Sequence, residues 1–388
     1  MGALLTSHID KGVVMGGFEA RTTTKKTRGM LMALAAATLV ASILALAAIL
    51  AASTTAEAQD SLQTSEVWVA DQGTNKIHIL SPLGAAKATL DLNGRVSKPH
   101  MLFFTPDHRY VLSANVGSGD VALIRASDRQ VVEVIKTGPG AHAAVPSPDG
   151  GRKAVVAHTT GKSLVELTWN ENRQGYDVGR RLDLASSAIC PAYTADGKTI
   201  YVTLGGGGLV VVDAQTFEII RSYGSDTVAP NGCGLALSRD GSRMYANSGT
   251  TAGGNLYAFD TKTHELLQTA PSGGPDPHGA AVLQNDGSLL TLNRLSDTAT
   301  IHDPDSLALT KTIAVGDAPD LVALSVDRRK AYITLRGPSP ATGTHDLAGT
   351  TPGIQIIDLD TMQATGTVKL DASASSDPHG IAVRYASR

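Results

Sequence analysis

The stretch KPHMLFFTPDHRYVLSAN, from Lys98 to Asn115, contains the pattern that decides the fold. An apolar run leads into the turn Thr105-Pro106-Asp107, and a second run, Tyr110–Asn115, follows that turn. Both runs have the composition of β-strands. The pattern recurs at intervals of roughly 45 residues, with one longer interval, which is the mark of a repeat protein. The six other copies begin at Ala141-His142, Cys190-Pro191, Gly232-Cys233, Pro277-His278, Pro319-Asp320 and Pro378-His379.

Each copy predicts four short antiparallel strands. The first two are joined by a tight turn, often Asp-Gly as at Asp196-Gly197, which tolerates the positive φ that hairpin turns need. The third strand ends in an acidic turn such as Asp213 with Thr216, where the carboxylate accepts hydrogen bonds from nearby amides. A fourth strand follows, as at Glu218-Ile219-Ile220.

Four-stranded units at this period predict the blades of a β-propeller, because no unit buries both of its faces until it stacks on its neighbours around an axis. The first unit, which contains Glu66–Asp71 and Lys76–Leu80, lacks an innermost strand, and residues 378–385 form an innermost strand without its companions. We expect these two ends to pair and leave no open edge. The expected fold class is all-β, a seven-bladed β-propeller with four-stranded blades, in which the C-terminal inner strand pairs with the N-terminal strands.

The repeat resembles the YVTN family of propeller repeats over about residues 64–386, through its apolar run, Asp-Gly turn and Tyr-Val strand. It departs from the WD40 type, because the chain has only Trp68 and Trp169 and no repeated Trp-Asp pair. The propellers of nitrous-oxide reductases, haem-d nitrite reductases and lactonases are more distantly similar. The resemblance implies a fold and does not imply one function.

The first 58 residues predict an export signal. Basic residues from Arg21 to Arg28 precede an apolar run from Met30 to Ala52, and Ala56-Glu57-Ala58 offers a cleavage site before Gln59. The run is also long enough for an uncleaved membrane anchor. Both readings place residues 59–388 outside the inner membrane, so that the sequence predicts a periplasmic or secreted bacterial protein.

The charge of the exported part gives no indication of nucleic-acid binding, which needs a basic surface. Residues 59–388 contain 28 basic and 33 acidic residues, a formal charge of −5. The chain also lacks a Cys-x-x-Cys-His haem motif, a Gly-x-Ser-x-Gly elbow and a His-Glu-x-x-His pair. Haem attachment and the common hydrolase and zinc-protease mechanisms therefore have no signature here.

Candidate metal ligands come from one position of the repeat. In the propellers that this repeat resembles, the residue at the start of each innermost strand faces the axis, and imidazole with thiolate favours copper, zinc or iron. Two alternatives stay open: the repeated Pro-His-Gly is inherited turn chemistry, and the two cysteines form a disulfide in an oxidising compartment. The seven residues are His100, His142, His278, His379, Asp320, Cys190 and Cys233.

A second set of polar residues follows the second strand of each blade and should open on the same face. Guanidinium groups in this set suggest a small anionic ligand, and ordinary turn capping is the alternative. An insertion from Gly337 to Gly353, rich in Gly, Pro and Thr, predicts a mobile loop between two strands that covers this face. The candidate ligand-binding residues are Arg294, Arg336, His158, Asn115, Asn247 and Asn293.

Three functional hypotheses follow. The sequence favours a non-catalytic binding or scaffold protein whose axial face meets a small ligand, a metal or a periplasmic partner protein. The second hypothesis is a metal-dependent oxidoreductase or hydrolase with the axial histidines as ligands and Asp320 as ligand or general base. The third is a lactonase-like hydrolase that uses His278 and Arg336.

Overall fold

The computed structural model describes residue 32 and residues 64–343, 347–371 and 373–385. The chain divides into two compact units, Met1–Gln59 and Asp60–Arg388, and the second unit carries every described strand. The predicted export signal, residues 1–58, lies outside the described residues except for Met32. No helix among the described residues is long and apolar enough to cross a membrane.

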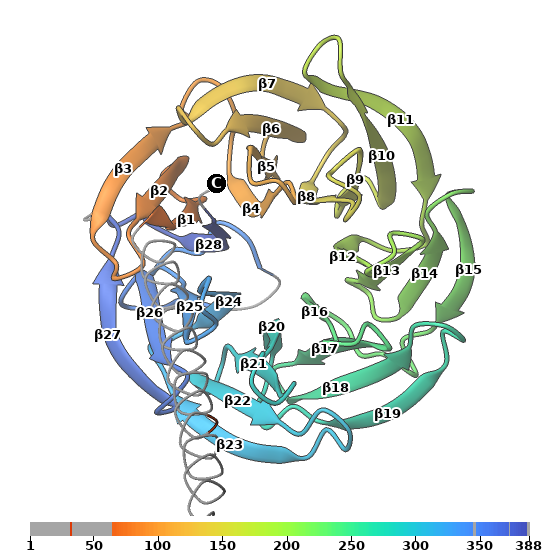
Figure 1. Cartoon of the computed structure of the whole chain (residues 1–388), viewed down its shortest axis with the longest axis vertical. Coiled ribbons are helices and arrows are strands. Elements are labelled where there is room, and N and C mark those ends of the chain that lie inside the picture. Colours follow the sequence, from red (N-terminus) through yellow and green to blue (C-terminus); the bar gives the residue numbers. More distant parts are fainter. Residues whose placement is uncertain (1–31, 33–63, 344–346, 372, 386–388) are drawn as a thin grey trace, which may run out of the picture. The chain divides into compact units, whose positions relative to one another are not determined.

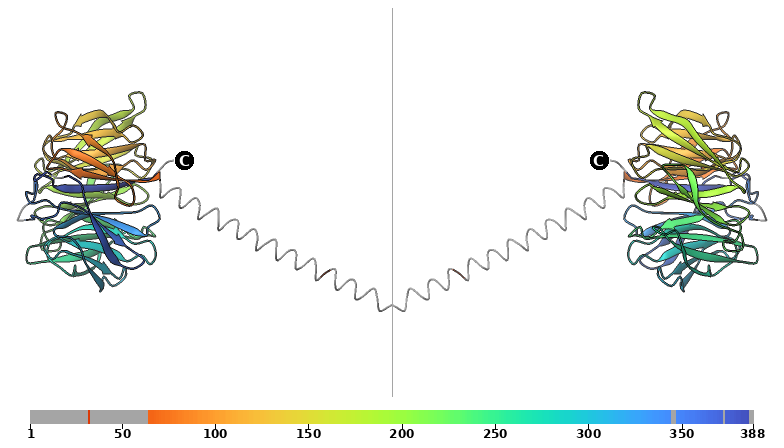
Figure 2. Two further views of the ribbon diagram at one scale, coloured as in Figure 1. Left: turned by 90° about the vertical axis from the view of Figure 1, so that its left-hand side faces the viewer. Right: turned by 90° about the vertical axis from the view of Figure 1, so that its right-hand side faces the viewer.

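The described strands form seven four-stranded antiparallel sheets arranged as blades around a central axis, which confirms the predicted seven-bladed propeller (Figure 1). Seen edge-on, the blades form a thick disc (Figure 2). The innermost strands are β4 (Pro99–Phe104), β8 (Ala141–Pro146), β12 (Ala188–Tyr193), β16 (Gly234–Leu237), β20 (Pro277–Val282), β24 (Pro319–Leu324) and β28 (Pro378–Arg384). The second strands are β5 (Tyr110–Asn115), β9 (Lys153–His158), β13 (Thr199–Leu204), β17 (Arg243–Thr250), β21 (Leu289–Asn293), β25 (Lys330–Leu335) and β1 (Glu66–Asp71).

The two remaining strands of each blade complete it toward the rim. The third strands are β6 (Asp120–Arg125), β10 (Ser163–Asn170), β14 (Leu209–Asp213), β18 (Gly253–Asp260), β22 (Thr298–His302), β26 (Gly353–Asp358) and β2 (Lys76–Leu80). The outermost strands are β7 (Gln130–Lys136), β11 (Gly175–Asp183), β15 (Glu218–Tyr223), β19 (Leu266–Pro271), β23 (Leu309–Ala314), β27 (Gln363–Lys369) and β3 (Ala86–Asp91).

The two ends of the propeller close the ring as predicted. Strand β28 pairs with β1 in antiparallel register, with Glu66 opposite Arg384 and Val69 opposite Ile381, and the seventh sheet has the order β28-β1-β2-β3. The blade is thus assembled from both termini of the unit, and the inner edge of β1 is paired with β28.

The core consists of apolar layers between adjacent blades. In one layer, Leu112 and Val121 of the β4–β7 blade pack with Ala144 and Val156 of the β8–β11 blade, all fully buried. A similar layer joins the β20–β23 and β24–β27 blades. Each blade is apolar on both faces because it is covered by a neighbour on each side.

The turns follow the sequence pattern. In the Asp196-Gly197 turn, Gly197 has a φ of 69°, a left-handed conformation that glycine adopts without steric cost. At the third turn, Oδ1 of Asp213 accepts hydrogen bonds from the amides of Gln215 and Thr216 at 2.8 and 2.7 Å. The acidic turn therefore has the hydrogen bonding that its spacing predicts.

The glycine after the axial histidine permits adjacent inner strands to approach closely. A Cβ atom on Gly279 would lie 2.9 Å from the carbonyl oxygen of Asp320, and one on Gly380 would collide with the carbonyl oxygen of His100. The Pro-His-Gly motif is thus in part a packing motif. The close approach of the strands explains why a glycine follows the histidine, but it does not explain why the residue before it is a histidine.

Candidate metal centre

The seven axial residues predicted from the repeat meet in one ring around the propeller axis. The imidazole rings of His100 and His379 stack with their centroids 3.7 Å apart, and the ring centroids of His100 and His142 are 4.2 Å apart. Asp320 lies between His278 and His379, with Nε2 to carboxylate distances of 3.4 and 3.3 Å. None of the seven side chains is more than 8% exposed. The complete ring comprises His100, His142, Cys190, Cys233, His278, Asp320 and His379.

Two groups of ligand atoms converge within this ring. The first is His278, Asp320 and His379, whose ligand atoms all lie within 4.8 Å of one another, and the second is His142 with the two cysteines. Ligand atoms held at about 2.0–2.1 Å by a tetrahedral metal lie about 3.3–3.4 Å apart. The two distances from Asp320 to the flanking imidazoles have this length, which exceeds that of a good hydrogen bond.

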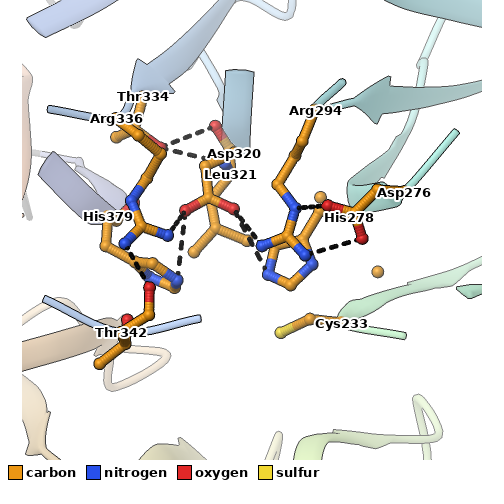
Figure 3. Close-up of polar contacts among 12 residues, drawn as sticks. Cys233, Asp276, His278, Arg294, Asp320, Leu321, Thr334, Arg336, Thr342 and His379 are labelled. Carbon is orange, nitrogen blue, oxygen red and sulfur yellow. Dashed lines mark hydrogen bonds and ion pairs between the residues drawn. The ribbon is translucent and has the colours of Figure 1, made fainter. Parts of the chain in front are cut away.

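Two buried arginines fix the carboxylate of Asp320 (Figure 3). Arg336 donates from one terminal nitrogen to Oδ2 of Asp320 at 2.9 Å, and Arg294 donates to Oδ1 at 3.3 Å. Each guanidinium also makes a two-pronged contact with a further carboxylate, Arg336 with Asp377 and Arg294 with Asp276. Burial alone would raise the pKa of Asp320, but the surrounding histidines and arginines lower it below its usual range.

These contacts bear on the predicted anionic ligand. Three carboxylates face two guanidiniums, so the cluster carries one net negative charge when its imidazoles are neutral. The forks of Arg294 and Arg336 are directed at carboxylates of the chain itself. The charge of the cluster therefore suits a cation better than an anion.

His379 presents a lone pair to Asp320. Its Nδ1 lies 3.2 Å from the carbonyl oxygen of His100, which can only accept, so Nδ1 carries the proton. Burial lowers the pKa of His379 to about 3, although Asp320 raises it, and the ring is neutral at pH 7. Nε2 is then an acceptor that faces a carboxylate oxygen, and a cation between the two acceptors would stabilise this arrangement.

His100 is oriented in the same way. Its Nδ1 lies 2.9 Å from Oε1 of Gln72, which can only accept a hydrogen bond, so Nδ1 carries the proton and Nε2 the lone pair. Nε2 has no hydrogen-bond partner in the part of the chain that the structure describes. Both ring nitrogens of His278 are likewise buried and without a hydrogen bond among the described residues, although Nε2 faces Asp320 at 3.4 Å. Burial holds the pKa values of His100 and His278 well below the usual range. Buried unpaired nitrogens of this kind call for an explanation, and a metal supplies one.

A cavity of about 240 Å³ leads to the ring from the face that carries the insertion. The four axial histidines, Arg294, Arg336, Thr342 and Gly343 line it. As predicted, the insertion lies between β25 and β26. Its Thr342 accepts from Arg336 at 2.8 Å and donates to Oε1 of Gln72 at 3.1 Å, so the insertion forms part of the wall of the site.

Four of the six predicted ligand-binding residues are internal to the blades and do not line the cavity. Asn115 bonds Asp120 at 2.9 Å, and His158 bonds Thr137 at 3.0 Å. Asn247 accepts from the amide of Gly234 and donates to the carbonyl of His278, and Asn293 donates to two threonines of its blade. Turn capping, the alternative left open by the sequence, accounts for the contact of Asn115, whereas His158 and Asn247 bond groups outside their own blades.

The two cysteines form a disulfide with a Cα–Cα distance of 5.2 Å, which joins the β12–β15 and β16–β19 blades next to the axis. This is one of the two alternatives that the sequence left open. Cys190 also lies near Met101, with Sγ and Sδ 3.7 Å apart.

Three residues that position the site were not among those predicted from the sequence, namely Gln72, Asp276 and Asp377. Asp276 and Asp377 precede His278 and His379 by two residues, in the motif Asp-Pro-His-Gly that occurs twice. That repetition was a usable signal. Gln72 had none, because its bonds to His100 and Asp377 depend on the closure of the ring.

Comparisons with known proteins support the fold. No protein-family model matches the chain. Antigen Lp49 of Leptospira interrogans is 27% identical over 156 residues, which are 39% of this chain and 33% of that protein. A solved structure of the dihydro-heme d1 dehydrogenase NirN aligns with a TM-score of 0.58 and 17% identity, covering 79% of this chain and 64% of that chain. Hydrazine synthase of Kuenenia stuttgartiensis aligns with a TM-score of 0.60 and 16% identity, covering 80% and 94%.

The alignment therefore spans a third of the antigen and less than two thirds of NirN. At this level of identity the two structures share a propeller fold with the chain and carry no statement about its ligand. The resemblance to YVTN repeats stays a prediction.

Proposed function

We propose that this protein binds a transition-metal cation of the zinc or copper kind on the propeller axis, with His278, Asp320 and His379 as ligands. The observation that carries the proposal is the 3.3 Å contact between Nε2 of His379 and Oδ2 of Asp320, two atoms that both act as acceptors at pH 7. Imidazole nitrogen and carboxylate oxygen together are a common ligand set for zinc and copper.

The neighbouring residues supply the support that metal ligands usually have. The carbonyl of His100 fixes the tautomer of His379, and Arg294 and Arg336 hold the carboxylate of Asp320 between the two imidazoles. Nε2 of His100, which also lines this cavity, has no hydrogen-bond partner among the described residues. The binding role, rather than catalysis, agrees with the lack of hydrolase and haem motifs in the sequence.

We also propose that the propeller works outside the bacterial inner membrane. The basic residues and apolar run before residue 58 support export, and the Cys190–Cys233 disulfide suits an oxidising compartment. N-terminal sequencing of the protein isolated from a periplasmic fraction tests this, with Gln59 expected as the first residue. Retention of the protein in the cytoplasm would contradict export and would leave the metal proposal unaffected.

The metal proposal is tested by elemental analysis of protein purified without chelators, with His379→Gln and His278→Gln as variants. We expect one zinc or copper ion per chain in the wild type, and loss of most of it in both variants. His302→Gln is the matched control, because His302 is equally buried but lies outside the axial ring, in β22, with its ring nitrogens 3.0 and 3.1 Å from the carbonyl oxygens of Leu307 and Ser272.

Two results would refute the proposal. One is a wild-type protein that contains no metal and whose melting temperature does not rise when zinc or copper is added, since a bound ion stabilises the folded state. The other is a metal content that falls equally in His302→Gln and His379→Gln, which would mean that the ion is held elsewhere.

A further inference from the structure

A second group of ligand atoms lies in the axial ring, in the blades across from Asp320. The ligand atoms of His142, Cys190 and Cys233 lie within 4.8 Å of one another. Sδ of Met101 lies 3.7 Å from Sγ of Cys190 and makes a fourth candidate donor. All four side chains are buried. Two sulfurs that bind one metal at about 2.3 Å in a tetrahedron are about 3.7–3.8 Å apart, so Met101 stands at ligand spacing.

The imidazole of this group is prepared as a ligand. Nδ1 of His142 has no hydrogen-bond partner within the described ranges, and the ring hydrogen-bonds the backbone of Ile189 through its other nitrogen. In a neutral imidazole the nitrogen that does not donate carries a lone pair, and here that nitrogen is Nδ1. A disulfide that only stapled two blades would require neither this imidazole nor a thioether beside it.

A route to the sulfurs exists on the other side of the ring. A cavity of about 440 Å³ is lined by Met101, Cys190 and Cys233 together with apolar residues such as Leu235 and Ile381. The residues that line this cavity come after the axial residues on the innermost strands. The smaller cavity of about 240 Å³ is lined in part by the loops after the second strands, at the opposite end of the axis. A small thiol entering this larger cavity would therefore meet the disulfide directly.

We propose that Cys190, Cys233, Met101 and His142 form a Cu(I) site that opens when the disulfide is reduced. Two molecules of a small thiol deliver two electrons and two protons to the S–S bond and leave joined as their own disulfide. Cu(I) then replaces the two cysteine protons, which pass to solvent, and is bound by two thiolates, the thioether and the imidazole. Thiolate and thioether are soft donors that select Cu(I). The site shares no ligand with the proposed centre at Asp320.

The test is a titration of the full chain with Cu(I) under anaerobic conditions, in competition with a chromophoric Cu(I) chelator, before and after treatment with a phosphine reductant. The reduced wild type should bind one Cu(I) more per chain than the oxidised protein, and X-ray absorption should show Cu–S bonds of about 2.3 Å. Met101→Leu, which keeps the volume of the side chain, should weaken binding about tenfold. His302→Gln, which lies outside the axial ring, should not change this binding, and the gain on reduction, rather than the total metal content, separates this site from the centre at Asp320.

Three outcomes would overturn the proposal. The first is equal Cu(I) binding by the reduced wild type and the reduced double variant Cys190→Ser, Cys233→Ser. The second is an unchanged affinity in Met101→Leu together with Cu–N bonds alone in the absorption spectrum. The third is unfolding of the chain on reduction, measured by circular dichroism, because the bond would then be a structural staple.

Discussion

Nε2 of His379 lies 3.3 Å from Oδ2 of Asp320, and the two residues belong to β28 and β24, the innermost strands of adjacent blades. Both atoms are acceptors at neutral pH, because Nδ1 of His379 is committed to the carbonyl of His100. The contact therefore connects the closure of the propeller, which brings β28 into place, with the chemistry of its axis.

Replacing Arg336 by Lys should destabilise the fold strongly. Arg336 is 1% exposed and bonds the carboxylates of Asp320 and Asp377, and a lysine cannot reproduce this planar fork. We expect the free energy of unfolding, measured in urea, to fall by about 2–4 kcal/mol. Arg329→Lys is the control, because Arg329 is 66% exposed and pairs with Asp360 at the surface, where the loss should stay within about 0.5 kcal/mol. Equal effects of the two variants would contradict the buried network.

Gly380→Ala should disrupt the contact between the β28 and β4 blades. A Cβ atom at this position collides with the carbonyl oxygen of His100, the acceptor that orients His379. We expect a loss of about 1–3 kcal/mol of unfolding free energy together with a lower metal content. Gly366→Ala is the matched control, since nothing lies within 4 Å of its added Cβ. A Gly380→Ala protein as stable as the control would show that the blades are not packed this closely.

The stability of the metal-free protein should fall as the pH decreases, in part because of His158. Burial lowers the pKa of His158 to about 4, below the value of about 6.5 expected in the unfolded chain. Between these two pKa values the unfolded state binds a proton at His158 that the folded state does not bind. The free energy of unfolding therefore has its full value above pH 6.5 and decreases by up to about 1.4 kcal/mol per pH unit below it. Urea unfolding at pH 6.5, 5.5 and 4.5 measures the slope. His158→Gln should flatten it, and parallel curves for the two proteins would exclude this contribution.

Removal of residues 378–388 should open the ring. The truncated chain loses β28, and β1 then presents an unpaired edge of fully buried residues, such as Trp68 and Val69, to solvent. We expect aggregation in size-exclusion chromatography and loss of the cooperative melting transition. A synthetic peptide of residues 378–388, added during refolding, should restore both. A truncated chain that stays monomeric and melts as before would contradict the closure.

Much of the axial ring could be predicted because a repeat fixes the phase of its residues. Once His100 is placed at the axis, the same phase places His278, Asp320 and His379 there as well. The prediction for Asn115 and Asn247 was less specific. Residues at this position of the repeat lie near the face with the cavity, but their side chains can also hydrogen-bond within the blade, as those of Asn115 and Asn247 do. The position of a residue within the repeat determines the strand or turn that carries it, and does not determine where its side chain points.

The sequence by itself determined the number of blades, the strands of each blade and the pairing of the two ends, because these depend on local composition and on period. The tertiary structure decided which axial side chains share a site. Gln72, Arg336 and Asp377 are distant in sequence and meet only when the ring closes. The tautomers of His100 and His379, and the burial that keeps them neutral, follow from the same closure, since an imidazole takes its proton position from the groups packed against it.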